Sequence, residues 1–183
     1  MDRRTTYLWG TILLLVLVAG GCASAFRGYG VHSSVDEFTG AAYDLMDNNV
    51  LGGGGFADAR VELNPQRFTP KGGSPTYQVF VQYEWSSWMF IEDGPSLVFL
   101  IDGERVEVRG PGSRGDRDVW EGGKVRETAM YQVSFALLER LAEGSEVKVR
   151  VVGSEFNMDR EFTATNFERF RDFVTRYPPS GMN

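Results

Sequence analysis

Alternate positions in residues 77–85 carry only large aromatic or β-branched side chains, from Tyr77 through Val79, Val81 and Tyr83 to Trp85. The intervening positions are mostly polar. A period of two with such side chains predicts a β-strand that buries one face. A sheet can bury that face only against a second layer, so the segment requires another sheet or helices packed on it.

Further strands are predicted on both sides of this segment. Asp102-Gly103 lies between two of them and favours a type I′ hairpin, because both central residues of that turn need positive φ. Residues 97–101 are apolar without alternation, which indicates burial on both faces. The other expected strands cover residues 41–46, 59–68, 105–108, 128–133, 147–151 and 157–163.

Two amphipathic helices are expected in the C-terminal half. Ser134 can cap a helix over residues 135–143 that stops at Gly144. Thr165 and Glu168 have the spacing of a capping box for a last helix. The fold class is therefore α+β, with a mostly antiparallel sheet or small β-sandwich and two helices. As an alternative within this class, the first helix could cross over between residues 128–133 and 146–152, making one parallel pair.

The first residues have the features of a secretory signal. Arg3 and Arg4 precede an uncharged apolar run over residues 8–19. This run is shorter than the roughly 20 apolar residues of a membrane-spanning helix. Small residues and the only cysteine of the chain, Cys22, follow it.

The stretch Ala19-Gly20-Gly21-Cys22 resembles the lipobox of bacterial lipoproteins. The resemblance implies that Cys22 becomes the lipidated first residue of the mature chain, and two acyl chains suffice for stable membrane anchoring. Ala23 then implies transfer to the outer membrane, with the domain on the periplasmic face. The alternative is an ordinary signal peptide cut near residues 23–25, which would discard the cysteine.

We expect residues 1–21 to be a signal peptide, residues 22–37 a lipidated flexible tether, residues 38–178 one globular domain and residues 179–183 a tail. A length of 183 residues fits a single domain. The net charge of −6 argues against nucleic acid as a partner. A single cysteine allows no internal disulfide.

The sequence predicts no catalytic residue, cofactor or metal site. Its one histidine, His32, lies in the expected tether, and a lipidated Cys22 would offer no thiol. Acidic pairs at residues 92–93 and at Asp102 and Glu104 flank the strand over residues 97–101. Two carboxylates about 5–10 Å apart can hydrolyse a glycosidic bond, but the strand separates these pairs by more than that. We interpret them as turn residues, with a glycan hydrolase or a calcium site as the alternatives.

Candidate binding residues come from two segments. Trp88 follows a predicted turn, while Trp120, Arg114 and Arg117 belong to a Gly-rich loop over residues 111–123. Aromatic rings stack on sugars or anchor protein interfaces, and arginines pair with acidic groups. Core packing and a solvated loop are the alternative interpretations. We therefore expect a non-enzymatic envelope lipoprotein that binds a protein or glycan, as an adaptor or structural module. A homodimer through an unpaired sheet edge is a third hypothesis.

The globular part resembles small uncharacterised envelope lipoprotein domains. The residues that carry this resemblance are Trp-Met-Phe-Ile at 88–91, the strand ending in Asp-Gly at 97–103, and Tyr-Gln-Val-Ser at 131–134. The resemblance implies no activity.

Overall fold

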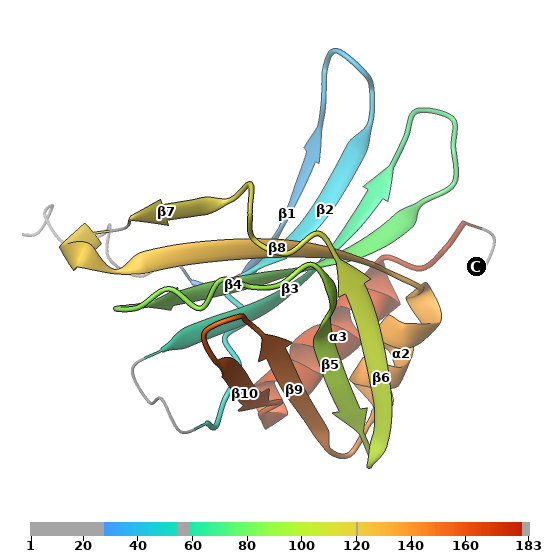
Figure 1. Cartoon of the computed structure of the whole chain (residues 1–183). Coiled ribbons are helices and arrows are strands. Elements are labelled where there is room, and N and C mark those ends of the chain that lie inside the picture. Colours follow the sequence, from blue (N-terminus) through green and yellow to red (C-terminus); the bar gives the residue numbers. More distant parts are fainter. Residues whose placement is uncertain (1–27, 55–58, 120, 181–183) are drawn as a thin grey trace, which may run out of the picture.

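The structure is a computed structural model that describes residues 28–54, 59–119 and 121–180. Its described strands form two antiparallel sheets (Figure 1). The larger sheet has the strand order β1-β2-β3-β4-β8-β7. Its strands are β1 (Gly30–Val35), β2 (Ala42–Asp47), β3 (Arg60–Thr69), β4 (Thr76–Trp85), β8 (Val125–Val133) and β7 (Arg117–Val119).

The smaller sheet has the order β10-β9-β5-β6. It is built from β10 (Asn157–Glu161), β9 (Val147–Val152), β5 (Gly94–Ile101) and β6 (Glu104–Gly110). A short 3₁₀ helix, η1 (Glu121–Gly123), precedes β8, and the helices α2 (Phe135–Glu143) and α3 (Ala164–Arg176) follow β8 and β10. The expected α+β class, with a mostly antiparallel, sandwich-like arrangement and two helices, is confirmed.

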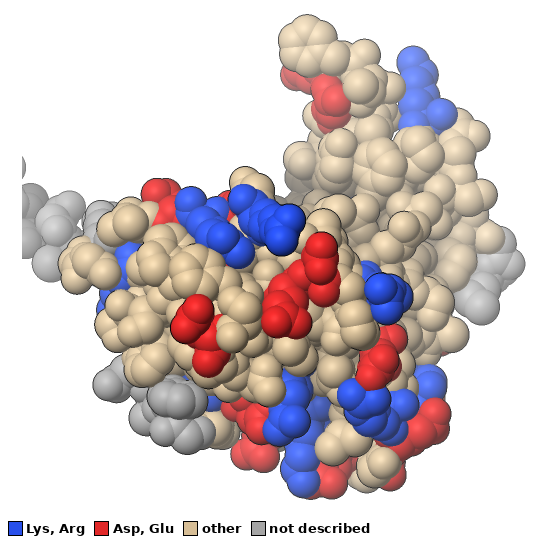
Figure 2. All heavy atoms as spheres, in the orientation of Figure 1, with Lys and Arg blue, Asp and Glu red and all other residues tan. Residues whose placement is uncertain are grey.

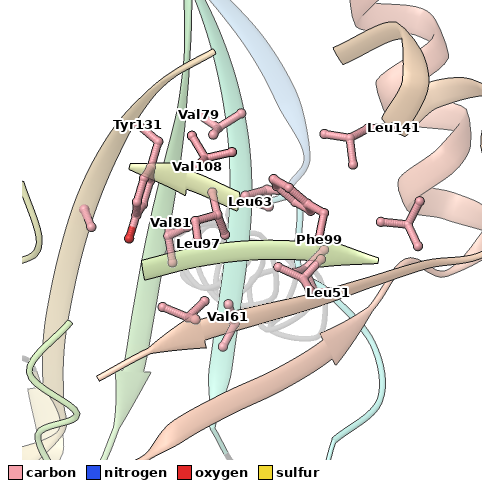
Figure 3. Close-up of a cluster of buried hydrophobic side chains, with 14 of the residues drawn as sticks. Leu51, Val61, Leu63, Val79, Val81, Leu97, Phe99, Val108, Tyr131 and Leu141 are labelled. Atoms are coloured by element: carbon pink, nitrogen blue, oxygen red, sulfur yellow. The ribbon is translucent and has the colours of Figure 1, made fainter. Parts of the chain in front are cut away.

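The core fills the space between the sheets. Val79 and Val81 of the larger sheet face Leu97 and Phe99 of the smaller one (Figure 3), and all four are completely buried. The helices add Leu138, Leu141, Ala142, Phe170 and Phe173 to the same cluster. Burial of these apolar faces is the main stabilising contribution to the fold.

Several local predictions are confirmed. Helix α2 has the expected bounds, and the Ser134 side chain accepts the Leu137 N–H as its N-cap. At the β5–β6 hairpin, Asp102 and Gly103 have φ of 50° and 85°. These are the positive values that the Asp-Gly turn requires.

The capping box of α3 lies two residues earlier than expected. It consists of Thr163 and Asn166 rather than Thr165 and Glu168. Asn166 is completely buried, and its Nδ2 donates to Asn49 Oδ1 and to the Val50 carbonyl at 2.9 Å each. Because Asn49 follows β2 in the chain, this contact joins the last helix to the larger sheet. A buried amide that makes both bonds determines where the helix begins better than an exposed Glu168 would.

Other expectations are corrected. Residues 30–35, which we expected in the tether, form β1 and pair with β2 along their whole length. Strands β8 and β9 belong to different sheets, so α2 does not connect a parallel pair. In β5, Leu100 is 39% exposed because its side chain faces away from the core. Only residues 97–99 and 101 are buried as expected.

The β1–β2 and β3–β4 hairpins project together from the body of the domain (Figure 1). At the end of the first, Asp36 accepts the Phe38 N–H and the Thr39 hydroxyl. Phe38 is 100% exposed on this turn, and Val35 is 65% exposed. A Cβ on Gly40 would lie 2.9 Å from Lys71 Cδ, so the tips of the two hairpins are in contact.

Within the described part of the chain, neither helix is long and apolar enough to cross a bilayer.

Candidate functional site

The connection from β4 to β5, residues 86–93, passes from the larger sheet to the smaller one. Its backbone is attached to both neighbouring loops. The Ser154 N–H donates to the Phe90 carbonyl, and the Ser113 N–H donates to the Ile91 carbonyl, at 3.1 Å each. Residues 88–91 form no strand, and Ile91 alone makes a bridge, to Gly153. The segment 86–93 therefore meets the loops that contain Ser113 and Ser154, and we call the meeting point of these three loops the junction.

A buried carboxylate organises this junction. Glu127 lies on β8 and is completely buried. Its Oε1 accepts the N–H groups of Met89 at 2.7 Å and Phe90 at 2.8 Å, and its Oε2 accepts that of Ile91 at 2.9 Å. The Ser113 hydroxyl donates to Oε2 at 2.6 Å. Three successive amides directed at one anion form a cradle of the kind that binds anions in proteins, and here a side chain of the same chain fills it.

The ring of Phe90 contacts both an aromatic ring and a cation. Its ring stacks on Trp88 with centroids 6.0 Å apart and an interplanar angle of 15°. Arg117 Cζ lies 4.7 Å from the centroid of the same ring, within the range of a cation–π contact. Arg117 Nε donates to the Ser113 hydroxyl at 3.0 Å, which fixes the arginine against the loop. The result is a row of three planar groups that the fold holds in position.

A pocket of about 410 Å³ lies beside this row. Its lining residues are Phe90, Ile91, Glu92, Asp93, Arg114, Arg117 and Ser154. Among the described residues, Arg114, Glu92 and Asp93 have no side-chain hydrogen bond or ion pair. Figure 2 shows basic side chains beside acidic ones in the middle of this face, near the β6–β7 loop and the start of β5. The pocket therefore presents both signs of charge, and of its charged lining residues only Arg117 has an ion pair within the described part of the chain, with Glu127 Oε2 at 3.8 Å.

A second hollow, of about 370 Å³, lies on the outer face of the smaller sheet. Most of its charged groups are already paired within the chain. Arg150 binds Asp159 through two bonds of 2.6 and 2.7 Å, and Lys148 Nζ lies 2.9 Å from Glu146 Oε1. Arg105 pairs with Glu107. Because a ligand there would compete with these pairs, we take the junction pocket as the stronger candidate.

Three of the predicted binding residues come together in the junction. Trp88 and Arg117 both contact the ring of Phe90, and Arg114 lines the pocket. Trp120 and Cys22 lie outside the described residues. Sequence reasoning missed Glu127, although a signal existed. In β8 the inward positions Val125, Ala129 and Tyr131 are apolar, and Glu127 occupies the same phase.

The acidic residues considered for hydrolysis are divided between two ends of β5. Asp102 accepts three hydrogen bonds, from the Ser145 hydroxyl and from the N–H groups of Ser145 and Glu146. These bonds lower the pKa of Asp102 below its ordinary value, and the bond from the Ser145 hydroxyl has the largest effect. Glu104 pairs with Arg140 at 2.9 Å. Glu92 and Asp93 lie in the junction pocket, at the opposite end of the strand.

No cluster of three or more His, Cys, Asp or Glu side chains suited to a metal ion occurs in the part of the chain that the structure describes. The chain was also compared with protein-family models, curated proteins and solved structures, and it matches none of them.

Proposed function

We propose that this chain is an outer-membrane lipoprotein, anchored through Cys22, whose periplasmic domain binds an envelope protein or glycan without catalysing a reaction. The lipobox-like residues 19–22 support the anchor. The row of Trp88, Phe90 and Arg117 beside an unpaired Arg114 is the observation that carries the binding role.

The arrangement suits binding because it is fixed before any ligand arrives. Glu127 holds the backbone of residues 89–91, and Ser113 connects that carboxylate to Arg117. A preorganised aromatic and arginine surface loses little conformational entropy when a partner binds. Stacked rings suit a sugar face, and the free guanidinium of Arg114 suits a carboxylate on a glycan or protein.

The hydrolase alternative has less support. A pair of catalytic carboxylates must converge on one bond. Asp102 is instead occupied by its three donors, and about eight strand residues at roughly 3.3 Å each separate it from Glu92 and Asp93. Replacing Asp102 should weaken the hairpin under the binding role, whereas it would abolish turnover under the hydrolase role.

The anchor is tested by palmitate labelling of cells that express the wild-type chain or its Cys22→Ala variant. We expect label only in the wild-type chain, and equal label in both would refute lipidation at Cys22. This experiment does not depend on the binding partner.

The binding role is tested by cross-linked pull-down from membranes and by co-sedimentation with purified peptidoglycan. The wild-type chain is compared with Arg114→Glu and with the matched control Arg105→Glu, since Arg105 is exposed but lies outside the junction pocket. We expect Arg114→Glu alone to lose the partner or the glycan. Equal recovery with all three chains would overturn the assignment of this pocket.

A further inference from the structure

The two described sheets have four outer strands, and three of them carry features that discourage pairing with another chain. Strand β7 has only three residues, two of them charged. Strand β6 alternates charged side chains, and its pairing with β5 contains a register shift. Strand β10 contains Asp159, Arg160 and Glu161, and residue Gly52 bridges to it. Charges, short length, irregular register and covering loops all keep an edge strand from pairing with another chain.

Strand β1 has none of these features. Its six residues, Gly-Val-His-Ser-Ser-Val, include no Lys, Arg, Asp, Glu or Pro. Its register with β2 is continuous from Gly30 to Val35. No described strand pairs with its other edge. An uncharged and regular edge of this kind is a template for an added strand.

We infer that β1 pairs antiparallel with β1 of a second copy of this chain, in the register that places Ser33 opposite Ser33. A two-fold axis perpendicular to the sheet relates the copies, so each side chain keeps its face. This inference does not depend on lipidation or on the junction pocket.

The side chains of β1 favour this register. Residues of one face alternate along a strand, and Val31, Ser33 and Val35 share the face of the buried Met46. Centring the pair on Ser33 puts the 65% exposed Val35 opposite Val31 of the second copy. Pairs of β-branched residues directly opposite each other stabilise antiparallel strands. If the register were shifted by one residue, the strand of the second copy would be turned over, and its other face would meet Val31, Ser33 and Val35.

A disulfide tests the register. Cα atoms directly opposite in an antiparallel pair lie about 4.5–5.5 Å apart, within the range that a disulfide bridges. The full chain with Ser33→Cys is oxidised mildly in membranes and compared with the parent chain and with Glu107→Cys on the exposed edge strand β6. We expect a covalent dimer of twice the chain mass only for Ser33→Cys.

Yields that are equal for Ser33→Cys and Glu107→Cys would overturn the proposal, and so would a cross-linked product of a different mass, which would indicate another protein's strand. A dimer in the parent chain would reveal a free Cys22 thiol. That result counts against lipidation, and the comparison is then made in the Cys22→Ala background.

Discussion

Glu127 Oε1 accepts the backbone N–H of Phe90 at 2.8 Å, and Phe90 has a φ of 54°. A bulky residue rarely adopts this left-handed conformation, which costs of order 1–3 kcal/mol. The carboxylate offsets that cost, since it also accepts the N–H groups before and after Phe90. The contacts of the Phe90 ring with Trp88 and Arg117 therefore depend on a side chain from β8.

Replacing Glu127 with glutamine should lower the free energy of unfolding by about 3 kcal/mol, since an amide places its own N–H groups against buried donors. Urea denaturation followed by circular dichroism measures the loss. Glu155→Gln, at an exposed position, serves as the control and should change the value by less than about 0.5 kcal/mol. Equal effects of the two changes would contradict a structural role for Glu127.

Gly153→Ala should destabilise the domain by about 1–3 kcal/mol through overpacking. A Cβ at this position would lie 2.4 Å from both Cγ and the carbonyl oxygen of Met89. Gly115→Ala is the matched control, because no atom lies within 4 Å of its Cβ position. Thermal unfolding of the two variants should show a lower midpoint for Gly153→Ala, and coincident curves would argue against this close approach.

Asn166→Ala should lower the free energy of unfolding by about 2–3 kcal/mol, because it leaves Asn49 Oδ1 and the Val50 carbonyl without their donor. Thr165→Ala, at an exposed position of the same helix, should have an effect below about 0.5 kcal/mol. Chemical denaturation of both proteins provides the comparison. A small loss for Asn166→Ala would mean that α3 is held mainly by its aromatic face.

Asp102→Asn should remove a pH-dependent contribution to stability. The pKa of Asp102 is lowered in the folded state from its ordinary value of 3.8, so its stabilising effect is complete above that value. It disappears as the pH falls through the folded pKa. The wild-type chain should therefore be more stable than the variant near neutral pH, and the difference should vanish in strong acid.

Unfolding of both proteins, measured from about pH 7 down to about pH 2, tests this expectation. Asparagine tolerates the positive φ of the turn, so the comparison isolates the carboxylate. A difference in stability that stays constant over this range would show that the charge of Asp102 contributes nothing.

The sequence predicted those parts of the fold that depend on neighbouring residues. Alternation identified β4, the Asp102-Gly103 pair identified its hairpin, and Ser134 identified the start of α2. Each of these signals acts through the local backbone, so it can be recognised without knowledge of the tertiary contacts.

Features that depend on distant contacts were not predicted. Residues 30–35 have two valines among glycine, histidine and serine, too weak a pattern to predict a strand, and pairing with β2 is what makes them one. The start of α3 is determined by Asn49, which lies 117 residues before Asn166. The junction depends on contacts between Glu127 and residues 89–91, which precede it in the chain by 36 to 38 positions. The candidate binding residues could be named from their chemical type, but their convergence on Phe90 could not.

Strand β1 is also a mechanical element. It is the first described strand of the chain, and its hydrogen bonds to described strands go to β2 alone. Tension applied to the preceding segment and directed away from the sheet acts first on the bonds near Gly30 and then on successive pairs toward Val35. An edge strand loaded in this way peels off pair by pair, at forces lower than those that would disrupt the buried strands. The hairpin would therefore yield under load before the junction around Glu127 is disturbed.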